Sequence, residues 1–391
     1  MGKFVVGFDV EGPIINPGFD FAWLVLENLV KVKDLKQLSE KVKIFDEYDD
    51  NRWLHERGIE GHSTGSTPII TALLAIAYGA RNEDFLRLAK QHLKLTPGAG
   101  ELLGWLKDEK RIQPYFISSA HPAAILPIAY QSGILSSHVF CSGNQLAHEK
   151  TATYDRQRIE KVGNGEETMQ KEIAERFPYE KYLNSQNLQD FLSRYLELCV
   201  EMNKSYASGR TDEEVVRSSR EKQLRLLEEI RGKDKALADD LRHLLYSEDG
   251  IMGAHRKKRV LMSIEKLERT KKENLIYTGD SIVDADPIAY AGNGISINCT
   301  NRQALTSSKI NIATPTMKSL VPIIEHIISN GQSLAEPTVS LQWKIDVETA
   351  AGTEAAPPVR VFMTGEIDRN IDAVIRTNRI CKDYVKKLYS Q

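Results

Sequence analysis

Two neighbouring carboxylates near the N-terminus have the spacing that phosphoryl-transfer chemistry requires. Asp9 and Glu11 follow a short apolar run, and Gly12-Pro13 after them suits a tight turn. One carboxylate of such a pair can attack phosphorus as a nucleophile, while the other exchanges a proton with the leaving group and then with water. The D-x-E pattern is common by itself, and a solvated loop is an equally good interpretation of it.

A second acidic pair follows an apolar run much later in the chain. The segment Gly279-Asp280-Ser-Ile-Val-Asp284 places two carboxylates four residues apart, which is one helical turn. Mg²⁺ prefers carboxylates together with waters and phosphate oxygens. Asp280 and Asp284 are therefore predicted metal ligands. The competing interpretation is one aspartate that caps a helix and another at the surface.

Hydroxyl groups and a basic run could bind the phosphate group, which carboxylates alone would repel. Phe116-Ile-Ser-Ser-Ala120 ends an apolar run in Ser118 and Ser119, where a hydroxyl could bind a phosphate oxygen beside free backbone N–H groups. The run His255-Arg-Lys-Lys-Arg259 holds Lys257 and Lys258, one of which could neutralise both a carboxylate and a transferring phosphoryl group. Taken singly, a helix cap would explain the serines and a solvated surface would explain the basic run.

The elements that position these groups alternate between strand and helix patterns. Strands are predicted at residues 3–8, 113–117, 274–278 and 294–298, and helices between them include residues 97–107 and 259–267. This alternation implies an α/β fold with a parallel sheet. Ligand sites in open α/β sheets form beyond the carboxyl ends of the strands, so the four features are expected to meet there.

The length of 391 residues exceeds that of a usual single core and predicts helical additions. The core is assigned to residues 1–15, 95–149 and 251–335. Residues 16–94 have helical patterns around an acidic and aromatic stretch at 45–53. Residues 150–250 are a predicted helical insertion, and residues 336–391 are a C-terminal extension that ends in a helix at about 367–389. The leucines of the insertion are interpreted as a packing seam, although a homo-oligomer formed through it stays open.

Composition excludes several classes of function. The 52 basic and 54 acidic residues give a net charge of −2, which offers no field for nucleic acid or an anionic membrane. No window approaches the roughly 18 apolar residues of a membrane span. The four cysteines lie far apart without short Cys or His spacing, which argues against a zinc cluster and for reduced thiols. A soluble, cytoplasmic protein is the expectation, because no export signal is visible either.

Together these residues resemble the motifs of the haloacid dehalogenase superfamily. The first motif is Phe8-Asp-Val-Glu-Gly12, the second ends in Ile117-Ser118, a lysine is the third, and the fourth is the segment from Gly279 to Asp284. The run 97–103 also resembles the segment before the second strand of that family. The D-x-E-G variant resembles a minority that includes phosphoserine:homoserine phosphotransferases and archaeal hydrogenase-associated subunit R proteins. The resemblance covers only the core, about half of the chain.

What the resemblance implies is a Rossmann-like core in which Asp9 is phosphorylated and Glu11 acts as acid and base. It places Mg²⁺ between Asp9, the backbone carbonyl of Glu11, Asp280 and Asp284. Ser118 and a lysine hold the phosphoryl group in this family. The implied activity is a phosphatase of a small phosphorylated metabolite.

The resemblance leaves open which lysine is the third motif and which residues of the helical segment contact the substrate. Lys257 fits the phosphoserine-phosphatase pattern of a lysine three residues before an apolar pair, while Lys258 is the alternative. Residues 16–94 stand where the family inserts a helical cap that closes over the site. The cap residues considered first for contacts to a charged substrate are Arg52, His55, Arg57 and His62.

Two other functions are weighed against the phosphatase. Most family phosphatases have Asp where this chain has Glu11, so transfer of the phosphoryl group to a second hydroxyl is one alternative. The other is a non-catalytic accessory protein that keeps the fold and uses its insertion and C-terminal helix as partner surfaces. The full set of Asp9, Glu11, Ser118, Asp280 and Asp284 favours catalysis.

Overall fold

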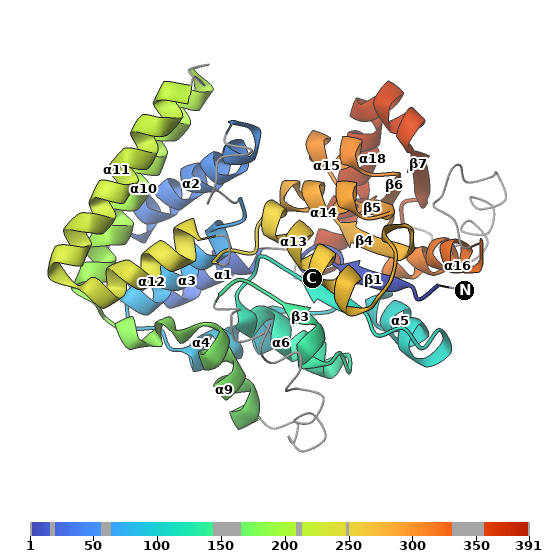
Figure 1. Ribbon diagram of the computed structural model, residues 1–391, viewed down its shortest axis with the longest axis horizontal. Helices are drawn as coiled ribbons and strands as arrows, with labels where there is room; N and C mark the ends of the chain where they lie inside the picture. Colours follow the sequence, from blue (N-terminus) through green and yellow to red (C-terminus); the bar gives the residue numbers. More distant parts are fainter. Residues whose placement is uncertain are drawn as a thin grey trace.

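Strand β1 (Val5–Phe8) is the third strand of a seven-stranded sheet with the order β3-β2-β1-β4-β5-β6-β7 (Figure 1). The computed structural model describes residues 2–15, 20–55, 64–143, 166–208, 213–247, 250–330 and 356–389. The other strands are β2 (Tyr115–Ile117), β3 (Val139–Phe140), β4 (Leu275–Gly279), β5 (Asn293–Ile297), β6 (Ile310–Ala313) and β7 (Arg360–Met363). Strands β1 to β6 are parallel, and β7 is antiparallel to β6.

Strand register brings the predicted motifs to one edge of the sheet. Phe8, the last residue of β1, is paired with Phe116 of β2 on one side and with Thr278 of β4 on the other. The backbone N–H of Asp9 donates to the carbonyl of Thr278 at 2.8 Å, which extends the ladder by one residue. The residues that follow these three strands therefore start side by side, at the carboxyl ends where α/β sheets bind ligands.

Side chains that alternate along the strands pack on two opposite faces of the sheet, as the two-residue period of a strand requires. Val6 and Phe8 belong to the large core, whereas Val5 and Tyr277 pack with helix α13 (Ala254–Leu267) on the other face. Helices cover both faces, which is how parallel sheets are buried. The remaining helices of this half are α5 (Ala99–Gly104), α6 (Pro122–Gln131), α14 (Ala285–Tyr290), α15 (Arg302–Ser307), α16 (Leu320–Asn330) and α18 (Thr364–Tyr389). Single turns complete it at Trp105–Glu109, Ser136–His138, Lys272–Asn274, Ile282–Asp284 and Met317–Ser319.

A second, purely helical unit stands beside the sheet and is built from two regions that are distant in sequence (Figure 1). The first region supplies α1 (Phe21–Leu29), α2 (Leu35–His55), α3 (Thr67–Ala77) and α4 (Asn82–His92). The insertion supplies α9 (Glu166–Arg176), a turn at Pro178–Tyr182, α10 (Gln186–Ala207), α11 (Glu213–Lys233) and α12 (Lys235–Tyr246). Helix α10 packs along α2: Phe45 lies 6.1 Å from Tyr195 between ring centroids, and Tyr48 stacks on Tyr206 at 5.9 Å. The two regions treated separately from the sequence thus share one apolar core.

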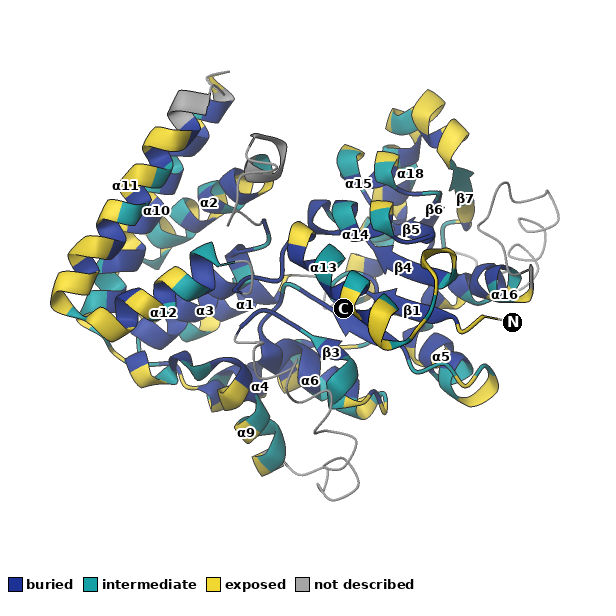
Figure 2. Cartoon of the chain, viewed as in Figure 1, coloured by how far each residue is buried: buried dark blue, intermediate teal, exposed yellow. Residues whose placement is uncertain are grey.

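The leucines of the insertion face inward. Helix α12 buries Leu237, Leu241, Leu244 and Leu245 within this chain. Figure 2 shows the same division along α11, whose outer face is exposed while its inner face is buried. A packing seam inside the chain therefore accounts for the leucine pattern.

The structure confirms the α/β class with a parallel sheet and helical additions. It differs from the sequence prediction at the start of helix α13 and in three strands that were not predicted, β3, β6 and β7. Helix α13 begins at Ala254, five residues before the predicted helix at 259–267, so the basic run forms the start of this helix. The C-terminal extension contributes β7, which was not predicted, and this strand pairs with β6 at residues 310–313. Within the described ranges, no helix is long and apolar enough to cross a membrane.

Candidate active site

Lys257 lies between two carboxylates at the centre of the strand-end cluster. Its Nζ is 3.0 Å from Oδ1 of Asp9 and 2.8 Å from Oδ1 of Asp284, and all three side chains are buried. Burial raises the pKa of Asp9 well above its ordinary value, and the charge of Asp284 raises it further, while Lys257 opposes both. Burial lowers the pKa of Lys257, but Asp284 and Asp9 outweigh it and keep the ammonium charged.

Asp284 is held by donors from its own loop and strand. Its Oδ2 accepts hydrogen bonds from the backbone N–H of Asp280 at 3.1 Å and of Ser281 at 3.2 Å, and from the Ser281 hydroxyl at 3.0 Å. The hydroxyl of Tyr277 donates to Oδ1 at 2.8 Å. Sequence reasoning missed Tyr277, which stands on β4 three residues before the acidic motif. With this many donors, Asp284 anchors both its loop and Lys257.

Asp280 approaches the turn after β1, and a glycine makes room for it. Gly12 has φ +94°, and a Cβ at this position would lie 2.6 Å from the carboxylate atoms of Asp280. Both the positive φ and the lack of space require glycine. Burial raises the pKa of Asp280, and an ion pair at 3.0 Å from its Oδ2 to Lys382 Nζ opposes that rise.

The carboxylates of Asp9, Asp280 and Asp284 fit a divalent cation. Oxygens from the three side chains lie within 4.8 Å of one another, and all three residues are buried. The charge of Asp284 raises the pKa of both Asp9 and Asp280, so the cluster concentrates negative charge even with its lysines in place. Hard oxygen donors crowded in this way are the ligand set that Mg²⁺ prefers.

Glu11 lies at the same cavity but is anchored toward the helical unit. Its Oε1 accepts a hydrogen bond from the backbone N–H of Phe21 at 3.0 Å, at the start of α1, where Asp20 caps the helix through Ala22 N–H at 2.8 Å. Burial raises the pKa of Glu11 well above its ordinary value, and Asp20 adds to this shift. A carboxyl with a raised pKa can carry a proton near neutral pH, as a general acid must.

The predicted phosphate-binding residues fall into two groups. Ser118 is buried directly after β2, and its hydroxyl accepts from the backbone N–H of Ala120 at 3.3 Å, whereas Ser119 lines the cavity. Lys257 is brought to Asp9. Lys258, the next residue on the helix, is half-buried, and among the described residues the lysines paired with Asp9, Asp280 and Asp284 are Lys257 and Lys382.

A cavity of about 460 Å³ lies in front of the cluster and is large enough for a small metabolite. Its walls come from three parts of the chain. The core contributes Asp9, Glu11 and Asp280, helix α2 contributes Asp46, Asp49 and Asp50, and helix α18 contributes Lys382 and Lys386. Sequence reasoning marked the acidic stretch at 45–53 without assigning it to the site, and it missed the two lysines.

The four cap residues proposed from the sequence are not placed. Arg52 and His55 belong to the last turn of α2, and their side chains lie outside the described part of the structure, as do Arg57 and His62 within residues 56–63.

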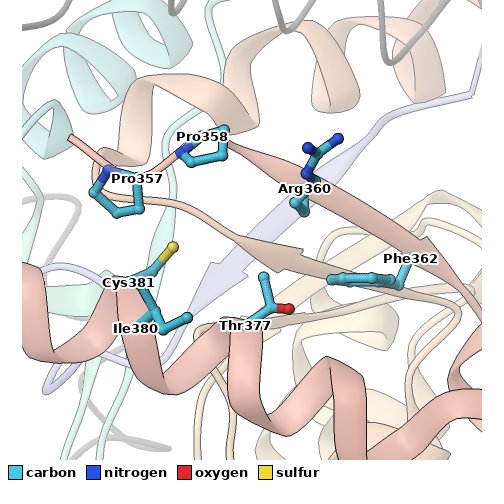
Figure 3. A pocket seen from close by; sticks show the side chains of 7 residues that line it. All are labelled: Pro357, Pro358, Arg360, Phe362, Thr377, Ile380 and Cys381. Carbon is cyan, nitrogen blue, oxygen red and sulfur yellow. The ribbon is translucent and has the colours of Figure 1, made fainter. Parts of the chain in front are cut away.

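A smaller cavity of about 260 Å³ lies between β7 and α18 (Figure 3). Of the described residues that line it, Arg360 is the charged one and most of the others are apolar. The carboxylate cluster lines the larger cavity instead.

The fold and the site together define a Rossmann-like α/β protein with a lysine-bridged carboxylate cluster beyond its strand ends. No family model and no curated protein matches the sequence. Gene product AF1437 from Archaeoglobus fulgidus is similar in structure over 98% of this chain and 97% of its own, at 17% identity and a TM-score of 0.60. A substrate-bound phosphoserine phosphatase complex is similar over 83% of this chain and 99% of its own, at 12% identity and a TM-score of 0.43.

A phospho-aspartyl intermediate analogue of phosphoserine phosphatase gives nearly the same result. It covers 83% of this chain and 100% of its own, at 13% identity and a TM-score of 0.44. The similarity to the archaeal gene product shows a shared fold.

Proposed function

We propose that this chain is a Mg²⁺-dependent phosphatase of a small phosphorylated metabolite that works through an aspartyl-phosphate on Asp9. The observation that carries the proposal is the cluster in which Lys257 bridges Asp9 and Asp284 while Asp280 lies within ligand distance of both. The resemblance of the four motifs to the haloacid dehalogenase superfamily supports the same activity. Glu11, where most family phosphatases have Asp, keeps transfer to a second hydroxyl as the alternative.

The first half-reaction moves the phosphoryl group to the protein. An oxygen of Asp9 attacks phosphorus, the bond from phosphorus to the leaving oxygen breaks, and Glu11 gives its proton to that oxygen. Lys257 and the Ser118 hydroxyl hold phosphoryl oxygens. Mg²⁺ bound by Asp9, Asp280 and Asp284 would neutralise charge on the transferring group.

The second half-reaction returns Asp9 to its free state. Water attacks phosphorus, Glu11 takes a proton from it, and the bond between phosphorus and the Asp9 oxygen breaks to release inorganic phosphate. We further propose that the unit of α1–α4 and α9–α12 serves as a cap, because Asp46, Asp49 and Asp50 of α2 face the cluster across the cavity. The cavity also leaves room for a second hydroxyl as the acceptor in place of water.

A phosphoester panel tests the proposal. Wild-type protein is expected to release phosphate with Mg²⁺ and to stop when a chelator removes the metal. Asp9→Asn, which keeps the shape but removes the nucleophile, is expected to lower turnover on the order of 10⁴-fold. Phosphorus label that appears on an added alcohol, and not as phosphate, would make the chain a phosphotransferase. Absence of turnover with every phosphoester would favour the accessory protein.

A further inference from the structure

The C-terminal helix α18 is fixed against the sheet by specific contacts. Strand β7 leads into it and pairs with β6. The amide of Asn378, which is fully buried, donates to the carbonyl of Cys299 at 2.6 Å and lies 3.1 Å from the side chain of Asn311 on β6. The apolar face of the helix is buried at Ile367, Val374, Cys381 and Val385. This docking sets the rotation of the helix about its own axis.

Lys382 follows Asn378 by four residues, so both side chains lie on the same face of α18. Its Nζ is 3.0 Å from Oδ2 of Asp280, and its side chain is 31% exposed. Lys386 lies one further turn along the helix, and both lysines line the cavity. The helix thus places the ammonium group of Lys382 at the side of the carboxylate cluster that lines the cavity.

The ammonium of Lys382 and a bound metal would compete for the same carboxylate, that of Asp280. Lys257 pairs with Asp9 and Asp284, whereas Lys382 pairs with Asp280, the third carboxylate of the proposed metal site. A divalent cation on Asp280 would weaken that pair, because it draws on the charge of the carboxylate and repels the ammonium. Asp20 also interacts electrostatically with Lys382 and offers it a second anion within the protein.

We propose that Lys382 is a substrate-binding residue, which pairs with Asp280 in the metal-free protein and binds an anionic group of the substrate once the metal takes Asp280. This inference rests on the proposed function. The anionic group is a phosphoryl oxygen or a carboxylate of the same metabolite. Lys382 therefore adds a cation to the substrate site from a segment outside the four motifs.

Metal affinity is the first measurement, and it needs no turnover. Mn²⁺ or Mg²⁺ is titrated calorimetrically into wild type, Lys382→Met and Lys387→Met, the last being an exposed lysine of the same helix. Loss of the competing ammonium is expected to tighten metal binding by about threefold to tenfold in Lys382→Met, with Lys387→Met unchanged. Unchanged or weaker metal binding in Lys382→Met would overturn the proposal.

Anion binding is the second measurement. With Mg²⁺ saturating, Lys382→Met is expected to bind inorganic phosphate or a phosphorylated substrate about tenfold more weakly, seen as a raised KM with little change in kcat. Lys382→Arg should retain most of the binding. If Lys382→Met bound the metal more tightly but showed unchanged phosphate affinity and KM, the substrate-binding role would be overturned. Lys382 would then only compete with the metal, or pair with Asp20 once the metal is bound. A wild type without turnover would defeat the phosphatase, while metal and phosphate binding would still decide the role of Lys382.

Discussion

The strand-end cluster and the acidic face of α2, formed by Asp46, Asp49 and Asp50, line the same cavity. Their carboxylates have different kinds of partners. In the cluster, each aspartate has a lysine within 3.0 Å. On α2, the hydrogen bonds between described residues come from neutral donors: Asp49 Oδ2 accepts from the backbone N–H groups of Gly65 at 2.6 Å and Ser66 at 2.7 Å, and Asp46 accepts from the Thr67 hydroxyl at 2.7 Å.

This difference predicts how the stability of the fold responds when a charged side chain is removed from each region. The cluster is balanced by cations in fixed positions, so removal of a lysine leaves buried charge without a partner. The carboxylates of α2 repel one another, and burial together with the charges of Asp20, Asp49 and Glu47 raises the pKa of Asp46 to about 6. Removal of the Asp46 carboxylate should therefore stabilise the fold where this group is charged. The following predictions test that contrast.

The largest effect is expected from Lys257→Met, which leaves Asp9 and Asp284 buried without their shared cation. The free energy of unfolding should fall by about 3 kcal/mol or more, because breaking a buried ion pair strands its partners. Urea denaturation measures the loss. Lys258→Met, at the adjacent half-buried position, is the matched control and should stay within about 0.5 kcal/mol of wild type. Equal losses in both variants would mean that the bridge has no special role.

A smaller effect is expected when Mg²⁺ is added to the cluster. A ligand that binds only the folded chain stabilises it by about 2.7 kcal/mol at a concentration of 100 Kd, which should raise the Tm of a chain of this length by about 3 °C. Asp280→Asn is expected to lose most of this increase, whereas Asp368→Asn, at an exposed position on α18, should keep it. Differential scanning fluorimetry with and without Mg²⁺ measures the change in Tm for each variant. An increase that survives in Asp280→Asn would place the metal elsewhere.

The smallest effect concerns the acidic face of α2 and depends on pH. The unfolded chain releases the proton of Asp46 near pH 4, whereas the folded chain keeps it to about pH 6. Rising pH across that window therefore favours the unfolded state. Asp46→Asn should be more stable than wild type by about 1 kcal/mol at pH 8, and the gain should vanish at about pH 4.

Urea denaturation at the two pH values measures this gain, with Glu40→Gln, at an exposed position of α2, as the control. A variant that is less stable than wild type at pH 8 would show that the carboxylate of Asp46 supports the fold.

The sequence could predict the strand-end part of the site because its geometry is local. Asp9, Ser118 and Asp280 each come directly after an apolar run, and parallel strands bring such positions together whatever the helices do. The choice between Lys257 and Lys258 depends on which face α13 turns to the sheet. Lys257 shares the buried face with Val260, Leu261 and Ile264, so the apolar period of that helix held the information once the correct start at Ala254 was known.

The parts that the sequence could not predict depend on contacts between distant segments. Lys382 reaches Asp280 only because β7 joins the sheet and Asn378 fixes the helix, and neither pairing has a local signature. The same holds for α2, whose acidic face looks toward the cluster because α10, about 150 residues later, packs on its other side. A four-residue strand such as β7 also lies at the lower limit that alternation can reveal.

Strand β7 also covers an edge of the sheet that could otherwise pair with another chain. Without it, β6 would be the edge of a parallel sheet and would offer four buried residues, Ile310–Ala313, as a template for another chain. With it, the outermost strand is half-exposed, carries Arg360 and is antiparallel to its neighbour, while the opposite edge, β3, is only two residues long. Deletion of the C-terminal segment would remove Lys382 and expose the edge of β6 at the same time. Single substitutions are therefore needed to separate an effect on the proposed activity from an effect on aggregation.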